Sequence, residues 1–355
     1  MTKQPRVHRA RRRPSMRDVA EAAGVSQTTV SLVLNDAANS GIPDNTKARV
    51  RAAADEVGYR TNRLARAMRL DRTETLGFVS ENIATTPFAT RMIKGAQDAA
   101  WEAGHLLLIF DTGAITSPNH SERERLAVEQ LLERQVDGIV IASMYHRVIE
   151  PPAALSEVPA VLVDLRAANG LVTSVVPDEH RAAYDATRHL IERGHTRIAH
   201  PTIDYPGAVA AAARLDGYRA ALRDHAIADD PALVITEPSD TPGGRTAARR
   251  LLSLDDPPTA IFCYNDQSAM GVYQHAAERG LQSPGDLSVV GFDDQELIAA
   301  ELVPGLTTMA LPHYEMGYWA VEHLLGIDSH PEPIQHTIPC RLVERSSVAP
   351  PRPGP

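Results

Sequence analysis

The sequence has few of the features that mark secreted, membrane or cofactor-dependent proteins. Its 355 residues include two cysteines, Cys263 and Cys340. Two cysteines in so long a chain exclude a disulfide framework, and we expect both to be reduced thiols in a cytoplasmic compartment. The basic N-terminus is not followed by an apolar segment, so no secretory signal is expected. No run of about 18 apolar residues occurs, and we therefore expect no membrane-spanning helix.

The sequence also lacks the short motifs of common cofactor sites. It contains no G-x-G-x-x-G, no phosphate-binding P-loop and no H-E-x-x-H, so we expect no cofactor. Asp185 and His189 lie four residues apart in a predicted helix, with His180 and His195 nearby. Metal ligation by this group is conceivable, but a solvated helix face is the simpler interpretation, and we expect no metal site.

Charge is distributed unevenly along the chain. The formal net charge is −9 overall. Residues 1–72, however, contain 15 Lys/Arg and 7 Asp/Glu, a net charge of +8, and the remainder contains 21 basic and 38 acidic residues, a net charge of −17. A basic head on an acidic body suits a protein in which one domain binds a polyanion and another is held away from it.

Residues 17–35, RDVAEAAGVSQTTVSLVLN, form the most informative segment. Apolar residues follow helical spacing in two short runs, and Gly24 between them supplies the backbone freedom of a tight turn. Ser26 is placed to cap the second helix, whose remaining outward side chains are uncharged and suited to a DNA major groove. The pattern predicts a helix-turn-helix with its recognition helix over 27–35, although a plain helical hairpin has the same periodicity. A third helix is predicted over 44–57.

Residues 17–68 resemble the DNA-binding headpiece of the LacI/GalR family of bacterial repressors. The family opening D-V-A-x-x-A-G-V-S-x-x-T-V-S-x-V-L-N is matched over 18–35, and the similarity continues in IPDNTKARV, GYRTN and RLARAM. Leu32 stands where the family usually has an Arg that reads guanine. Because Leu cannot donate a hydrogen bond, we expect a non-standard operator half-site at that position.

The resemblance implies a set of DNA-contacting residues in the recognition helix and in a hinge helix. The hinge is expected to order only on DNA, with Met68 as a minor-groove wedge and arginines on the flanking phosphates. The implied DNA-binding residues are Ser26, Gln27, Thr28, Thr29, Ser31, Leu32, Asn35, Asn62, Arg63, Arg66 and Met68.

From residue 75 onward, short apolar segments alternate with helical ones. This alternation predicts the α/β class with parallel, buried sheets in two similar halves. The predicted strands are 75–80, 105–110, 136–142, 160–164, 197–200, 232–236, 259–266 and 287–294, and the predicted helices are 92–102, 122–134, 182–193, 207–224, 244–252 and 267–279.

The resemblance implies a two-lobed periplasmic-binding-protein-like core with three crossovers between the lobes. We predict a disordered basic arm over 1–14, a helix-turn-helix domain over 15–60, a hinge helix and linker over 61–73, the core over 74–347 and a disordered tail over 348–355. Lobe 1 is expected to comprise about 74–165 and 304–326. Lobe 2 is expected to comprise about 166–303 and 327–347, including a strand near 337–343.

Polar residues at strand ends are the candidates for a ligand site in the cleft between the lobes. Asp164, Asp266 and Asp293 each end a predicted strand. The resemblance supports Asp164 and Asp266 and adds Arg214 through an R-L-x-G motif. An Arg fork with carboxylates can bracket vicinal hydroxyls, and an aromatic ring can cover a sugar face. Each charge could equally cap a helix or pair across the lobes. The expected effector-binding residues are Phe88, Asp164, Arg214, Tyr264, Asp266, Phe292 and Asp293.

Together, the patterns and the resemblance imply a ligand-responsive transcriptional regulator, expected to be a repressor. It would bind near-palindromic double-stranded operator DNA as a homodimer, under the control of a small-molecule effector expected to be a sugar or sugar derivative. Two alternatives stay open: a solute-binding protein without a regulatory role, and an α/β enzyme. The basic head argues against the first, and the absence of an associated nucleophile and base argues against the second.

Overall fold

The structure is a computed structural model, and it describes residues 14–35, 41–60, 72–83, 89–204, 207–327 and 333–352. The predictions for the N-terminal arm, for Phe88 and for the hinge lie outside the described residues, and those for the hinge include Asn62, Arg63, Arg66 and Met68. The chain divides into two compact units, Met1–Thr73 and Glu74–Pro355, which are described separately.

The first unit is built on three helices, α1 (Met16–Ala23), α2 (Gln27–Leu34) and α3 (Asp44–Val57). Their buried faces form one cluster that includes Val19, Val30 and Val50, each fully buried. Gly24 caps the C-terminal end of α1 with a left-handed φ of 63°. The Ser26 hydroxyl accepts the Thr29 N–H at 3.1 Å and so caps α2. The helix-turn-helix prediction is confirmed, because turn, cap and buried spacing lie where the sequence placed them.

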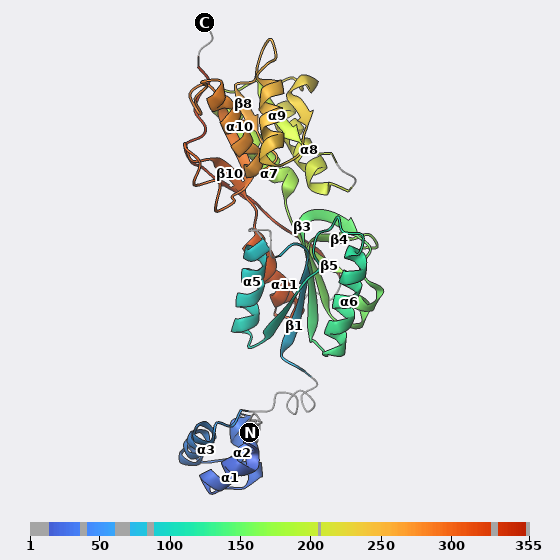
Figure 1. Cartoon of the computed structure of the whole chain (residues 1–355), viewed down its shortest axis with the longest axis vertical. Helices are drawn as coiled ribbons and strands as arrows, with labels where there is room; N and C mark the ends of the chain where they lie inside the picture. The colour runs from blue at the N-terminus through green and yellow to red at the C-terminus, as the bar shows by residue number, and fades with distance from the viewer. Residues whose placement is uncertain are drawn as a thin grey trace, which may run out of the picture. The chain divides into compact units, whose positions relative to one another are not determined.

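The second unit contains two six-stranded sheets (Figure 1). In the first sheet the strand order is β11-β5-β4-β3-β1-β2, and every pair is parallel. Its strands are β1 (Thr75–Ser80), β2 (Leu106–Asp111), β3 (Gly138–Ile149), β4 (Ala160–Ala167), β5 (Thr173–Pro177) and β11 (Gln335–Ile338).

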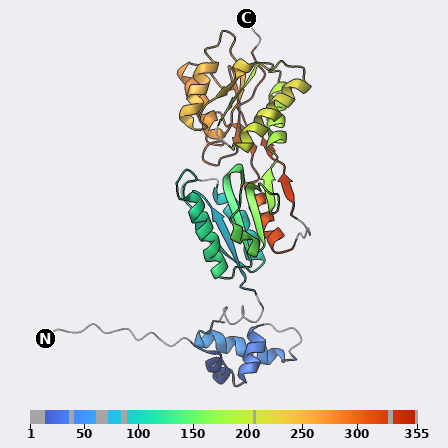
Figure 2. The same ribbon diagram turned by 90° about the vertical axis from the view of Figure 1, so that its right-hand side faces the viewer.

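Helices cover both faces of the first sheet (Figures 1 and 2). Helices α5 (Ala89–Glu102) and α11 (His313–Leu324) pack together on one face, and α6 (His120–Glu133) with the short η1 (Ala153–Glu157) covers the other. Burial on both faces explains why strands such as β1 read as continuous apolar runs.

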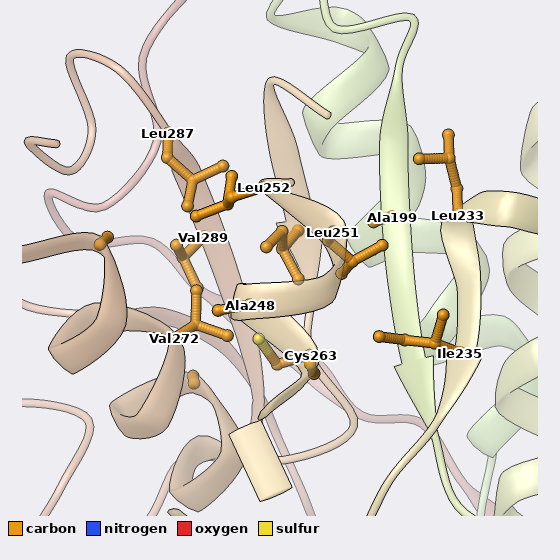
Figure 3. Packing of buried hydrophobic residues seen from close by; sticks show 14 of the residues in the cluster. Ala199, Leu233, Ile235, Ala248, Leu251, Leu252, Cys263, Val272, Leu287 and Val289 are labelled. Carbon is orange, nitrogen blue, oxygen red and sulfur yellow. The ribbon is translucent and has the colours of Figure 1, made fainter. Parts of the chain in front are cut away.

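The second sheet has the order β12-β10-β9-β8-β6-β7, with all pairs parallel except β10 with β12. Helices α7 and α8 pack on one face, and α9 and α10 on the other. Figure 3 shows the second of these interfaces, where Leu251, Val272 and Val289 meet. The elements are β6 (Ile198–Thr202), β7 (Val234–Thr236), β8 (Ala260–Phe262), β9 (Ser288–Asp293), β10 (Thr307–Ala310), β12 (Arg341–Val343), α7 (Glu179–Glu192), α8 (Val209–Asp224), η2 (Pro231–Leu233), α9 (Thr241–Leu251) and α10 (Asp266–Glu278).

The chain passes between the two sheets three times: after β5, after β10 and after β11. The predicted lobe boundaries were wrong at each passage. Strand β5 belongs to the first sheet rather than to lobe 2, β10 belongs to the second sheet rather than to lobe 1, and residues 337–343 are divided between β11 and β12. The physical reason is that the buried backbone N–H and C=O groups of a strand need hydrogen-bond partners. Strand β5, which precedes the first crossover, finds them in β4 and β11 of the first sheet.

Among the described residues, no helix combines the length and the apolar character needed to cross a lipid bilayer. Within the same ranges, no three His, Cys, Asp or Glu side chains are grouped as metal ligands. Asp185 pairs with Arg181 and Arg188, and His195 contacts the hydroxyl of Thr259, so the group considered from the sequence does not assemble.

Candidate DNA-binding helix and interlobe ligand site

The outward face of α2 is short, polar and uncharged. Gln27 and Thr28 are exposed at its first turn, and Leu32 lies one turn later with 38% of its surface exposed. The other predicted contacts are engaged locally: Thr29 and Ser26 share a hydroxyl–hydroxyl bond of 2.9 Å, and the Asn35 amide donates to the Ser31 carbonyl at 2.6 Å. The geometry therefore leaves Gln27, Thr28 and Leu32 as the side chains best placed to reach base edges.

A cavity of about 90 Å³ lies between the two lobes of the second unit. Met144, Tyr145 and His146, near the end of β3, line it together with Asp164 of β4. From the second lobe it is lined by Glu179, Ala210, Arg214, Ser239, Tyr264, Asn265, Gln267 and Asp293, and from the β10–α11 crossover by Leu311 and His313. The carboxyl ends of strands from both sheets thus converge on it, as expected for this fold.

Arg214 is held on four sides. Its guanidinium donates from Nε to Glu179 Oε2 at 2.6 Å, from Nη2 to Glu179 Oε1 at 3.2 Å, and from Nη1 to the Tyr264 carbonyl at 2.6 Å. Its Cζ lies 3.6 Å from the ring centroid of Phe292 and 4.5 Å from that of Tyr264. Burial alone would lower the pKa of Arg214, but the charge of Glu179 raises it above its ordinary value. The Arg fork is therefore occupied by a protein carboxylate.

Gly217, one turn after Arg214 in the R-L-x-G motif, sets the distance between α8 and α7. A Cβ at this position would lie 2.2 Å from the carbonyl oxygen of His180. The missing side chain lets the two helices approach closely, which brings Arg214 on α8 to Glu179 in the first turn of α7.

Asp164 is buried at the cavity wall, with 4% of its surface exposed. Its φ of 55° is left-handed, a conformation that non-glycine residues rarely adopt and that concentrates at functional sites. Within the described part of the chain, its Oδ1 has no hydrogen-bond partner. Burial, together with the charge of Glu179, raises the pKa of Asp164 well above its usual range.

Asp293 and Asp266 differ in where their carboxylates point. Asp293 lines the cavity with a φ of 105°, and burial raises its pKa to about 6 although Arg214 lowers it. Asp266 does not line the cavity: its Oδ1 accepts from the Thr308 hydroxyl at 2.6 Å and its Oδ2 from the Gln295 N–H at 2.7 Å. Both oxygens of Asp266 are thus used to fix the start of α10, and its neighbours Asn265 and Gln267 face the cavity.

Two models of known families match this chain. Residues 15–62 match "Bacterial regulatory proteins, lacI family", and residues 187–348 match "Periplasmic binding protein-like domain". The chain is 31% identical over 347 residues to the HTH-type transcriptional repressor PurR of Vibrio atlanticus, covering 94% of this chain and 98% of that relative. It is 33% identical over 342 residues to the ribose operon repressor of Escherichia coli, covering 94% and 99% respectively. The chain belongs to the LacI family of bacterial regulatory proteins.

Solved structures agree with this membership. The crystal structure of the lac repressor dimer bound to operator and an anti-inducer superposes with a TM-score of 0.79 at 26% identity, covering 95% of this chain and all of that one. The predicted family and fold class are confirmed. The protein is a transcription regulator with a helix-turn-helix domain and a periplasmic-binding-protein-like core, and membership of this family excludes the enzyme and the simple solute-binding protein.

The structure of this LacI-family protein brings together four of the seven predicted ligand residues: Asp164, Arg214, Tyr264 and Asp293. Phe292 lies behind Arg214 and supports its guanidinium instead of lining the cavity. Asp266 does not line the cavity, because its carboxylate is bonded to Thr308 and Gln295.

Sequence reasoning missed Glu179, which pairs with Arg214, and the two buried histidines of the lining. In the described residues, neither ring nitrogen of His146 has a hydrogen-bond partner. Burial lowers the pKa of His146 to about 4 and that of His313 to about 3, so both rings are neutral at neutral pH. The predicted strand ended at residue 142, whereas β3 continues to Ile149, and this error hid His146.

Proposed function

We propose that the protein is a homodimeric repressor of the LacI family that acts in the cytoplasm on a near-palindromic operator. The observation that carries the proposal is the exposed, capped and uncharged face of α2, with Gln27 and Thr28 in its first turn. Such a face can enter the major groove without burying a charge, while basic residues elsewhere in the headpiece neutralise phosphates. A two-fold dimer prefers a two-fold site.

The relatives support this proposal. The lac repressor was solved as a dimer on its operator, and the structure of another relative is a complex with cellobiose. By analogy, we propose that Asn62, Arg63, Arg66 and Met68 contact the operator.

We further propose that the interlobe cavity binds the effector, through Asp164, Asp293 and Tyr264 directly and through Arg214 as the residue that organises the wall. The effector must bind one lobe arrangement better than another, and operator DNA must distinguish the same two arrangements. Both lobes contribute to the cavity lining, so ligand binding is sensitive to their relative position.

The test is operator selection from random double-stranded DNA with the full-length protein. We expect a symmetric consensus whose binding weakens steeply with salt. At the base pair facing Leu32 we expect no strong guanine requirement, because Leu offers only van der Waals contact to a thymine methyl. The Leu32→Arg variant is the matched comparison and should gain a guanine preference worth about 1–3 kcal/mol. Failure to select any symmetric DNA would refute the proposed function.

A further inference from the structure

The lining of the interlobe cavity contains more acidic than basic groups. Asp164, Glu179 and Asp293 line it, and among the described lining residues the only cation is Arg214. Arg147 and Arg166 are the further cations of β3 and β4, and neither is part of the lining. Arg147 instead lies 3.8 Å from the buried Glu81.

The single cation of the lining is already neutralised. Glu179 takes two N–H groups of Arg214, and the Tyr264 carbonyl takes a third. Nη2 of Arg214 also lies 3.9 Å from Asp293 Oδ1. An anionic ligand group beside Arg214 would find this guanidinium already paired and would lie next to carboxylates, which is unfavourable in a poorly hydrated cavity.

The other two carboxylates of the lining are less fully paired than Glu179, and Asp293 has only the 3.9 Å approach of Arg214 Nη2, which Glu179 already bonds. Asp164 lines the cavity and has only 4% of its surface exposed. Its Oδ1 accepts no hydrogen bond from the described residues. Asp293 accepts from the Gln295 amide at 2.9 Å through Oδ2, which leaves Oδ1 on the side of Arg214. Buried polar groups are nearly always hydrogen-bonded, so an unmet acceptor on a cavity wall indicates a donor on the ligand.

We propose that the effector carries a positively charged nitrogen, as in an amino sugar or another small polyhydroxylated amine, and that this group binds Asp164 and Asp293. This inference rests on the proposed role of the cavity as the effector site. An ammonium group offers donors and no acceptor, which matches two carboxylates. The Gln267 side chain lines the same cavity and offers an amide to the ligand's hydroxyls. Sugar phosphates and sugar acids are excluded by the same charges.

The burial of both carboxylates agrees with this inference. Burial raises the pKa of Asp293 to about 6 and that of Asp164 well above its usual range. A bound cation would stabilise the ionised forms and lower both pKa values.

The experiment compares neutral, cationic and anionic ligands, with each amino sugar set against its parent sugar. Full-length protein is titrated by calorimetry and thermal shift with glucose, glucosamine and glucose 6-phosphate, with galactose and galactosamine, and with ethanolamine and putrescine. We expect at least one amine to bind at least tenfold more tightly than its neutral counterpart, and no sugar phosphate to bind. Equal or better binding of the neutral sugar, binding of the phosphate, or no binding of any amine would each overturn the inference.

Variants localise the effect to the cavity. Asp164→Asn keeps the shape of the side chain and should reduce the amine preference at least tenfold. Asp216→Asn removes an exposed carboxylate of α8, whose side chain is 76% accessible, and should leave the preference unchanged. An amine preference that survives Asp164→Asn would place the site elsewhere. Operator selection separates the two proposals: selected DNA without amine binding refutes only this inference, whereas no selected DNA refutes the proposed function.

Discussion

Arg214 and Glu179 form a buried, two-point ion pair between the first turn of α7 and the middle of α8. Each side chain has 4% of its surface exposed. The pair therefore fixes the position of the guanidinium before any ligand arrives, and it determines which charges remain for the ligand to meet.

Removing one partner of this pair should be strongly destabilising. Arg214→Ala leaves a buried, unpaired carboxylate, and we expect a loss of about 3–5 kcal/mol in the free energy of unfolding of the core. Urea denaturation measures it. The matched control is Arg181→Ala, which breaks the exposed Arg181–Asp185 pair and should leave stability nearly unchanged, because solvent screens an exposed ion pair. Similar losses of unfolding free energy in both variants would show that the buried ion pair is no more important for stability than the exposed one.

Adding a single methyl group to Gly217, the glycine of the R-L-x-G motif, should destabilise the core. Gly217→Ala places a methyl group 2.2 Å from the His180 carbonyl oxygen, so α8 must shift away from α7. We expect a loss of about 1–3 kcal/mol in the stability of the core, together with weaker ligand binding, because Arg214 moves with α8. Asp216→Ala, at the exposed neighbouring position, should change stability by less than about 0.5 kcal/mol. A stable Gly217→Ala variant with unaltered ligand affinity would contradict this account of the motif.

Substitutions of Ser26, which caps α2, and of Thr28, which is exposed in its first turn, should have different effects: the first on headpiece stability and the second on DNA binding. Ser26→Ala removes the hydroxyl that accepts the Thr29 N–H, and we expect a loss of about 1 kcal/mol in headpiece stability. Hydrogen exchange of the α2 amides reports it. Thr28→Ala, on the exposed face, should leave exchange unchanged and weaken binding to the selected operator. The assignment fails if Thr28→Ala accelerates exchange as much as Ser26→Ala does.

Acid should destabilise the core through His200. Its ring is fully buried between Tyr218 and Phe262, and burial lowers its pKa to about 4 from an ordinary value of about 6.5. Between those values the unfolded chain binds the proton and the folded chain does not. Stability therefore falls as pH drops through this window, by up to about 1.4 kcal/mol per pH unit for this one group.

The His200→Asn variant tests this pH dependence. Its amide can replace Nδ1, which lies 2.8 Å from the Phe262 carbonyl, without titrating. Denaturation at several pH values between 4.5 and 6.5 should show a shallower slope for the variant than for the wild-type protein. Parallel slopes would assign the acid sensitivity to other groups.

The sequence by itself determined the local features. The helix-turn-helix was readable because Gly24, Ser26 and the apolar spacing act within a few residues of one another, and the α/β class was readable because buried parallel strands are apolar throughout. Arg214 could be placed through a short motif, and Asp164 and Asp293 because strand ends line ligand sites in such folds.

Only the tertiary structure decided which distant groups meet. Strand partners depend on crossovers that no local pattern encodes, and so β5, β10 and β11 could not be assigned to their sheets from the sequence. The partner of Arg214 lies 35 residues away in sequence, in the first turn of another helix, where an acidic residue normally signals only a helix start. Which acidic group neutralises Arg214 depends on which side chains lie next to it in the folded protein, and the local sequence does not contain this information. The sequence therefore indicated Arg214 and Asp164, whereas the fold determined that Glu179 neutralises Arg214 and that Asp164 Oδ1 has no hydrogen-bond partner among the described residues.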